Sequence, residues 1–220
     1  NTQGDVLTGM VVDKSGQVYI AGYTMLVSNT NFDYFTAKYD AAGKQKWVAR
    51  YDAAGKEDFA NALTVDPRTG DVYVTGSSIG PSYRTDAVTI KYDSQGVQRW
   101  LARYNRTYDT WDRGDDIELD ARGNVYVIGP GGNDYTVIKY DQNGKLKWSV
   151  FHYDLQSHFY HVATDLAVDE SGNAYVTGYG HDRETGHDII YKTVKYGPAG
   201  AKQWTAEFKT AYKDFSQGTK

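Results

Sequence analysis

Asp13-Lys-Ser-Gly16-Gln-Val-Tyr19-Ile-Ala-Gly22 is the first of four copies of one stretch, spaced about 50 residues apart along the chain. The later copies begin at Asp66, Asp120 and Asp169. Each unit then continues with a second stretch, which in the first unit is Lys38-Tyr39-Asp40-Ala-Ala-Gly43-Lys-Gln-Lys-Trp47 and in the others ends at Trp100, Trp148 and Trp204. A repeat of this length, built from short alternating strands, is typical of a β-propeller blade.

Each unit contains four strand-like runs, which in the second unit are residues 61–65, 71–75, 87–92 and 98–104. Apolar residues alternate with others, as at Leu63 and Val65. An Asp and a Gly stand between neighbouring runs. They predict a tight turn there, because Asp caps such a turn and Gly supplies a positive φ. The sequence therefore predicts an all-β chain, a β-propeller of four repeats in which each repeat is a four-stranded antiparallel blade.

A repeat that runs from end to end predicts one β-propeller domain over residues 1–220, with blades at approximately 5–57, 58–113, 114–160 and 161–213. The tail Lys213-Asp214-Phe215 resembles Glu57-Asp58-Phe59 and therefore begins a fifth inner strand. Four outcomes stay open: a closed ring of four blades, further blades that complete a longer ring, self-association of two copies, or a tail that packs elsewhere. The chain starts at Asn1 without a signal-peptide pattern, so we expect it to be processed or cut from a longer protein.

Composition excludes several classes of function. The net charge is −4 with acids and bases interleaved, so no basic stripe is available for nucleic acid. No apolar run approaches the roughly 18 residues of a membrane span, which predicts no membrane insertion. The chain has no cysteine, which excludes disulfides, thiol catalysis and thiolate metal sites. Its 20 tyrosines supply apolar rings to a chain that is only 40% hydrophobic.

Three sets of repeated residues have structural interpretations. The tryptophans that end the repeat are predicted to occupy equivalent, largely buried sites between blades. The lysines before the Tyr-Asp turn are expected on a solvated or tyrosine-stacked outer face. The aspartates that open the first stretch are expected to cap turns, because one carboxylate per turn offers too few oxygens for Ca²⁺. The lysines are Lys38, Lys91, Lys139 and Lys195, and the aspartates are Asp13, Asp66, Asp120 and Asp169.

The combined pattern is Asp-x-x-Gly-Asn-x-Tyr-Val-Thr-Gly, followed by Asp-Tyr-x-x-x-Lys-Tyr-Asp-x-x-Gly-x-x-x-Trp. It resembles the bacterial SBBP-type β-propeller repeat over essentially the whole chain. Its Gly-x-x-x-Trp ending is also similar to the tryptophan-docking repeats of quinoprotein-like propellers. The resemblance implies an extracellular or cell-surface protein whose repeats serve as binding or structural modules rather than enzymes. It also implies more blades than the four present.

Loops between the second and third strands, and between successive blades, vary in length and are expected on one face, where function usually lies. All five histidines fall within residues 152–187 and are expected in such loops. Neutral imidazoles beside carboxylates suit Zn²⁺, Cu²⁺ or Ni²⁺. The alternative is exposed residues that never converge, because no tight ligand spacing is present. The candidate metal ligands are His158, His161, His181 and His187.

A second candidate site lies at the entry to the third unit. Tyr108 and Trp111 stand among acids, and an exposed aromatic ring flanked by carboxylates is a pattern that sugar-binding surfaces use. The alternative is a tryptophan packed between two blades. Asp115, Asp116 and Asp165 align near the channel end of the innermost strands. Paired acids there suggest glycosidic hydrolysis, with a polar channel mouth that holds water or a cation as the simpler interpretation.

These observations favour a non-enzymatic binding or structural module of a secreted or cell-surface bacterial protein. Its ligand, a carbohydrate or a protein, is expected on the loop-rich face. The alternative is an enzyme that uses the same face, either a metal-dependent oxidoreductase or a lyase or hydrolase. No cofactor is expected, and a divalent metal at the histidines is the exception that the sequence leaves open.

Overall fold

The computed structural model describes residues 4–25, 31–53, 55–80, 83–107, 111–131, 134–152, 159–182 and 189–209. These residues form four antiparallel sheets, each of four strands in sequence order, and no helix. The strands are β1 (Val6–Val12), β2 (Val18–Met25), β3 (Phe32–Tyr39) and β4 (Gln45–Tyr51); β5 (Asp58–Val65), β6 (Val72–Ile79), β7 (Thr85–Tyr92) and β8 (Gln98–Tyr104); β9 (Asp116–Leu119), β10 (Val125–Gly131), β11 (Asp134–Tyr140) and β12 (Leu146–His152); β13 (Phe159–Val168), β14 (Ala174–Asp182), β15 (Ile189–Tyr196) and β16 (Lys202–Lys209).

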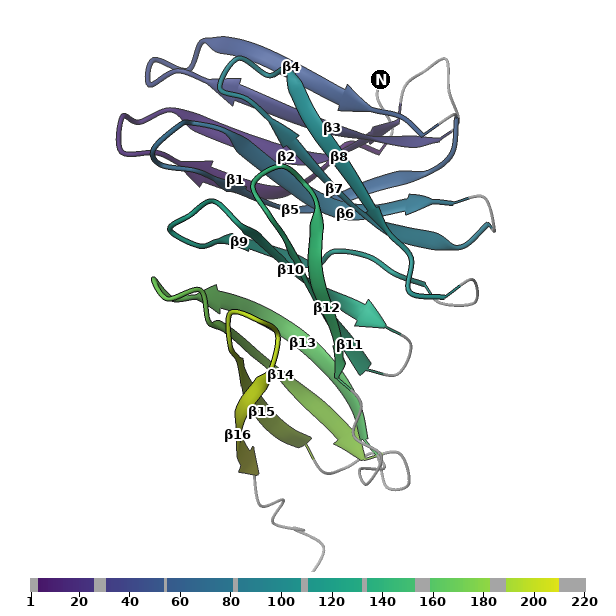
Figure 1. Cartoon of the computed structure of the whole chain (residues 1–220). Helices are drawn as coiled ribbons and strands as arrows, with labels where there is room; N and C mark the ends of the chain where they lie inside the picture. Colours follow the sequence, from purple (N-terminus) through teal and green to yellow (C-terminus); the bar gives the residue numbers. More distant parts are fainter. Residues whose placement is uncertain are drawn as a thin grey trace, which may run out of the picture.

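The predicted all-β propeller architecture is confirmed, and the four sheets follow one another as blades (Figure 1). The described residues contain no helix that is long and apolar enough to cross a membrane. In the fourth sheet β13 begins at Phe159, two residues before the blade boundary expected at 161. The exact division into blades otherwise stays a prediction.

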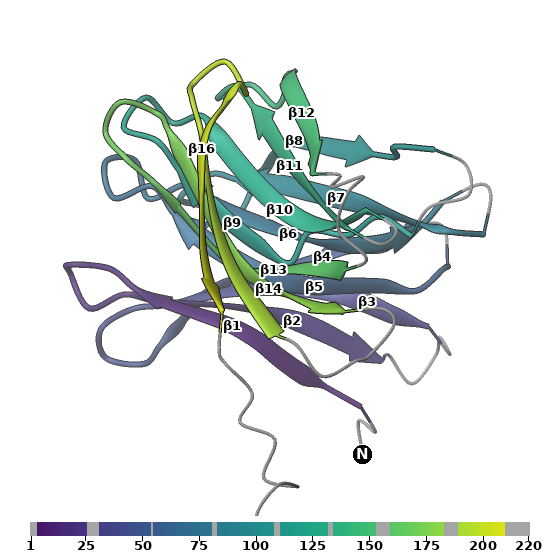
Figure 2. The same ribbon diagram turned by 90° about the horizontal axis from the view of Figure 1, so that it is seen from below.

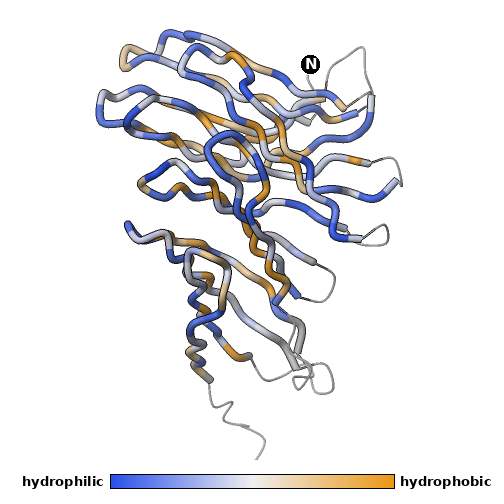
Figure 3. Tube along the Cα trace, in the orientation of Figure 1, coloured by the Kyte–Doolittle hydropathy of each residue, from blue (hydrophilic) through white to orange (hydrophobic). Residues whose placement is uncertain are grey.

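The innermost strand of each blade lies beside that of the next blade: β1 contacts β5, β5 contacts β9, and β9 contacts β13. Hydrophilic residues concentrate in the hairpin turns, while hydrophobic residues lie along the strands (Figure 3). Buried apolar side chains form three clusters, one at each junction between adjacent sheets. At the first junction, Tyr19 and Tyr34 of the first sheet pack with Val74, Val88 and Ile90 of the second. Each blade thus buries against its neighbour the apolar side chains that a single sheet would leave exposed.

The aspartates that open each repeat cap their turns, as predicted. Asp169 Oδ1 accepts the backbone N–H groups of Ser171 (3.0 Å) and Asn173 (2.9 Å), and its Oδ2 accepts the Asn173 side chain at 2.7 Å. Hydrogen bonds from the side chain and backbone of Asn173 lower the pKa of Asp169 to about 2. The carboxylate therefore stays charged and keeps the turn closed at neutral pH.

The repeated lysines lie over tyrosine rings, as the expectation of a tyrosine-stacked face predicted. Lys38 Nζ lies 5.0 Å from the centre of the Tyr19 ring, and Lys139 Nζ lies 4.6 Å from that of Tyr126. Of the two expected environments, solvated or tyrosine-stacked, these two lysines have the second, because each is only 7% exposed. Their alkyl chains are covered at the blade junctions, where the tyrosine rings also lie.

Three of the four repeated tryptophans dock on the next blade. Trp47, Trp100 and Trp148 are half-buried, and each donates its indole N–H to a backbone carbonyl in the β-turn between the outer two strands of the following sheet. The glycine of that turn lets the ring approach closely. A Cβ on Gly144 would lie 2.7 Å from the Trp100 ring, and one on Gly96 would lie 2.7 Å from Trp47. The positive φ of these glycines (82° at Gly96 and 79° at Gly144) also shapes the turn.

Trp204 departs from this pattern, so the prediction of four equivalent buried tryptophans is wrong. It is 43% exposed, because no fifth turn covers it in the described part of the chain. Gly43, which occupies the matching turn of the first sheet, has open space where a Cβ would lie. The first and fourth sheets lie at opposite ends of the row of blades (Figure 1). The described blades therefore form an open arc, which is seen from below in Figure 2.

Candidate functional site

The structure gathers acidic side chains on the innermost strands of the third and fourth blades. Asp116 and Glu118 belong to β9, Asp115 directly precedes it, and Asp165 belongs to β13. Burial raises the pKa of Asp115, Asp116 and Glu118, and the charge of Asp165 raises the pKa of Asp116 and Glu118 further. Three of the predicted site residues thus lie in one electrostatic cluster, together with Glu118, which the sequence analysis missed.

Much of this cluster is held in place by hydrogen bonds. Asp116 Oδ2 accepts the backbone N–H of Leu166 in the next blade at 3.0 Å, and its Oδ1 accepts that of Ile117 at 2.8 Å. Asp115 Oδ1 accepts the Arg113 guanidinium at 2.6 Å. Asp165 is exposed. Asp116 therefore links the inner strands of two blades and Asp115 holds an arginine, while Asp165 offers its carboxylate to solvent.

Trp111 is an exposed tryptophan at the loop that enters the third blade, with 53% of its surface accessible. The Arg84 guanidinium carbon lies 4.8 Å from the centre of its ring. The neighbouring backbone is fixed, because the Asp112 N–H donates to the Thr85 carbonyl at 2.9 Å. The ring is thus oriented by the second blade without being covered by it. Tyr108, predicted as its companion, lies outside the described residues.

The three histidines whose backbone is described occupy strands where loops were expected. His152 ends β12, His161 lies in β13 and His181 lies in β14, because β13 and β14 stay paired as far as Phe159 and Asp182. His161 Nδ1 lies 2.8 Å from Asp134 Oδ1 across the junction between the third and fourth blades. His158, His187 and the side chain of His181 lie outside the described residues. A metal site at the four predicted histidines therefore stays a prediction.

His152 lies beside His161 with the two rings edge to face, 5.5 Å apart between centres. It stacks on Tyr135 at 4.6 Å, and its Nδ1 lies 3.2 Å from the Tyr196 hydroxyl. Burial lowers the pKa of His152 to about 4. The imidazole is therefore neutral at physiological pH and contributes to the packing of this junction.

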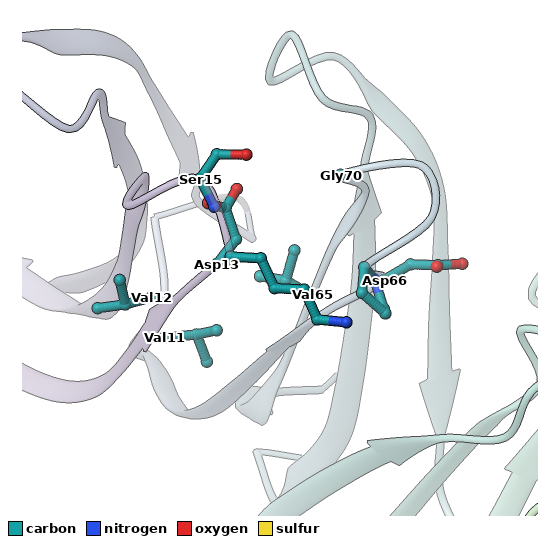
Figure 4. A pocket seen from close by; sticks show the side chains of 9 residues that line it. Val11, Val12, Asp13, Ser15, Val65, Asp66 and Gly70 are labelled. Carbon is teal, nitrogen blue, oxygen red and sulfur yellow. The ribbon is translucent and has the colours of Figure 1, made fainter.

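A pocket of about 280 Å³ lies on the opposite face, between the first turns of the first and second blades (Figure 4). Asp13 and Ser15 line one side, and Asp66 and Gly70 line the other. The one-residue-longer turn from Asp66 to Gly70 was the only sequence signal for it. Both aspartates are occupied as turn caps, and Asp66 also binds Arg68 at 2.8 Å. The polar groups of this pocket therefore serve the turns.

Sequence comparison gives the repeat its family. Residues 46–83 and 159–182 match the family model described as SBBP, a beta-propeller repeat. These two segments carry the SBBP-type β-propeller repeat. The matched segments contain the two innermost strands of the second and fourth blades. The search of curated proteins found no match.

Solved structures with a similar arrangement include an endo-arabinase from Bacteroides thetaiotaomicron, with a TM-score of 0.52 at 11% identity, covering 91% of this chain and 80% of that one. A protein of unknown function from Dyadobacter fermentans has a TM-score of 0.49 at 9% identity, with 90% and 74% covered. Drosophila Plexin A, solved in complex with Semaphorin 1b, has a TM-score of 0.49 at 10% identity, with 95% and 45% covered. At these identities the likeness concerns the fold alone.

Proposed function

We propose that this SBBP-type chain is a non-enzymatic binding module of a secreted or cell-surface protein, and that it binds carbohydrate beside Trp111. The observation that carries this proposal is the exposed indole of Trp111, held in a fixed position next to Arg84 while three other tryptophans dock between blades. A rigid exposed ring suits stacking against a sugar. The exposed carboxylate of Asp165 supplies an acceptor for sugar hydroxyl groups.

Binding is favoured over catalysis because of how the acids are used. A glycosidase needs one carboxylic acid and one free carboxylate on either side of the scissile bond. Both oxygens of Asp116 accept backbone N–H groups, and Asp115 is held by Arg113. These interactions support a structural role for the two acids. A hydrolase that uses the same face is the alternative, and arabinan is the first polysaccharide to test because an endo-arabinase shares the fold.

A glycan array followed by titration calorimetry tests the proposal. We expect binding to at least one glycan, and a loss of affinity of about tenfold or more, equivalent to about 1.4 kcal/mol, in Trp111→Ala. Glu170→Gln, which changes an exposed turn residue of the fourth blade, is the control and should bind normally. An array without any bound glycan, or turnover of arabinan by the wild-type chain, would contradict a non-enzymatic carbohydrate-binding role.

A second candidate function is association through the two open faces of the arc, with a second copy of this chain as the occupant. The fourth blade exposes Tyr191 (45%), Trp204 (43%) and Phe208 (66%). By strand register Tyr191 corresponds to Tyr34, which is fully buried at the first junction. The fourth blade therefore presents the apolar face that earlier blades bury.

The first blade presents the complementary face. A hollow of about 210 Å³ there is lined by Phe35, Ala37 and Tyr39, whose register equivalents Val88, Ile90 and Tyr92 are buried against the preceding blade. We expect light scattering to show concentration-dependent oligomers of the wild-type chain and a monomer for Trp204→Ala. A wild-type monomer at every concentration would contradict this contact between copies.

A further inference from the structure

Three aspartates converge at the loop end of the junction between the first and second blades. Asp33 lies near the start of β3, Asp52 follows β4, and Asp58 begins β5. One carboxylate oxygen from each lies within 4.8 Å of those from the other two. Asp33 is 2% exposed and Asp58 is fully buried, whereas Asp52 is exposed. Three negative charges thus share a small space that opens to solvent on the side of Asp52.

Two of these buried carboxylates have oxygens without a hydrogen-bond partner. Asp58 Oδ2 accepts the Ala53 N–H at 2.7 Å, but its Oδ1 lacks a partner of hydrogen-bond geometry, although the Ser78 hydroxyl lies near enough to lower its pKa. Asp33 Oδ1 is also buried without a partner. Leaving a buried carboxylate oxygen unpaired is costly, so these atoms require a hydrogen-bond donor or a cation that the described side chains do not supply.

The positively charged side chains nearby are used elsewhere or lie too far away to pair with these acids. Arg103 acts on Asp58 through its charge but binds Asp86 at 2.8 Å. Lys56 donates to the Gly80 carbonyl at 2.9 Å. Arg50 acts on Asp33 only through its charge, without an ion pair among the described contacts. None of these three cations forms an ion pair with Asp33, Asp52 or Asp58 among the described contacts.

In the second blade, the residues at the positions of Asp33 and Asp52 have hydrogen-bonding partners. Asp86 is the register equivalent of Asp33, because they pair with Ser78 and Thr24 at corresponding positions of β6 and β2. Asn105 follows β8 as Asp52 follows β4. Asp86 is bound by Arg103 at 2.8 Å and by Asn105 at 2.7 Å. Arg103 and Asn105 therefore satisfy Asp86, and an asparagine stands where the first junction has Asp52.

At the third junction a histidine contacts the aspartate equivalent to Asp33. Asp134 is the next register equivalent of Asp33, and it meets His161 Nδ1 at 2.8 Å. A donor side chain thus contacts the equivalent aspartate at both later junctions. At the first junction Asp52 stands where the second has Asn105, and a cation from solution would satisfy the three carboxylates that converge there.

We propose that Asp33, Asp52 and Asp58 bind a divalent cation at the first junction, and that the cation is Ca²⁺. All three ligands are carboxylate oxygens, which hard cations prefer. Oxygens bound to one Ca²⁺ at about 2.3–2.6 Å lie up to about 5 Å apart, which matches the observed spacing. The exposed side of Asp52 leaves room for waters to complete the coordination, and bound Ca²⁺ would clamp the first blade to the second.

The test compares metal-free chain with and without 1 mM CaCl₂ after treatment with EDTA and desalting. We expect calorimetric titration to give one Ca²⁺ per chain, and Tm to rise by roughly 5–10 °C once Ca²⁺ exceeds its Kd by about 100-fold. Mg²⁺ at the same concentration should give a smaller rise, because it demands a tighter octahedral site.

Asp52→Asn is the decisive variant, because it gives the first junction the asparagine that the second junction already carries at the corresponding position. We expect it to lose the Ca²⁺-induced rise in Tm while the metal-free form melts at or above the wild-type temperature, since repulsion is relieved. Glu170→Gln, with the same change of charge at an exposed turn, should respond as the wild type does. An unresponsive wild type, an equal response in Asp52→Asn, or an equal response to Mg²⁺ would overturn the proposal.

Discussion

Replacing Trp100 by alanine should lower the free energy of unfolding by roughly 2–4 kcal/mol, somewhat less than the 3–5 kcal/mol typical of a fully buried tryptophan. The indole packs on the turn glycine Gly144 and donates to the Gln142 carbonyl at 3.0 Å, so its loss removes both apolar contact and a hydrogen bond at the second junction. Urea unfolding followed by circular dichroism measures the change.

Trp204→Ala is the matched control, because it removes the same side chain from the same position of the repeat where the described residues provide no following blade. Trp204 is 43% exposed, and we expect a loss below about 1 kcal/mol in dilute, monomeric protein. Similar losses for both variants would mean that docking on the next blade does not stabilise this fold. The difference between the two losses therefore measures how much docking on the next blade contributes to the free energy of unfolding, apart from what a tryptophan contributes within its own outer strand.

The sequence was informative wherever a feature is local and repeated. The turn caps at Asp13 and Asp169 and the glycines of the outer hairpins depend on residues within five positions of one another, so four copies of the pattern sufficed to predict them. The position of Trp204 was not predictable in this way. Whether a repeated side chain is buried depends on whether another blade follows, and the repeat pattern is identical in either case.

The acidic sites show a second limit. Asp33 and Asp58 are 25 residues apart and belong to different sheets, so only the docking of one blade on the next brings them together. Aligning the repeats gives a signal after the fact, because Asp52 replaces an asparagine at the matching position of the second blade. For Asp115, Asp116 and Asp165 the alignment of inner strands predicted only a common level near the channel end, and the structure adds Glu118 to their electrostatic cluster.

The turn glycines allow an internal test of docking. Gly144 (φ 79°) and Gly43 (φ 78°) have the same left-handed backbone, so replacing either by alanine costs about 1–2 kcal/mol in strain. Only at Gly144 does the new Cβ also meet a ring, at 2.7 Å from Trp100, whereas at Gly43 it meets nothing within 4 Å. We therefore expect Gly144→Ala to cost about 2–4 kcal/mol and Gly43→Ala about 1 kcal/mol, as measured by urea unfolding.

A double-mutant cycle assigns the excess to the ring. In a Trp100→Ala background the clash at Gly144 disappears, so Gly144→Ala should then cost about the same as Gly43→Ala, with a coupling energy of about 1–2 kcal/mol between positions 100 and 144. Equal costs for the two glycines in the wild-type background, or additive effects in the cycle, would mean that the turn tolerates a side chain beneath the indole. Coupling of the expected size would instead show that the glycine of each outer hairpin serves the tryptophan of the blade before it as well as its own turn.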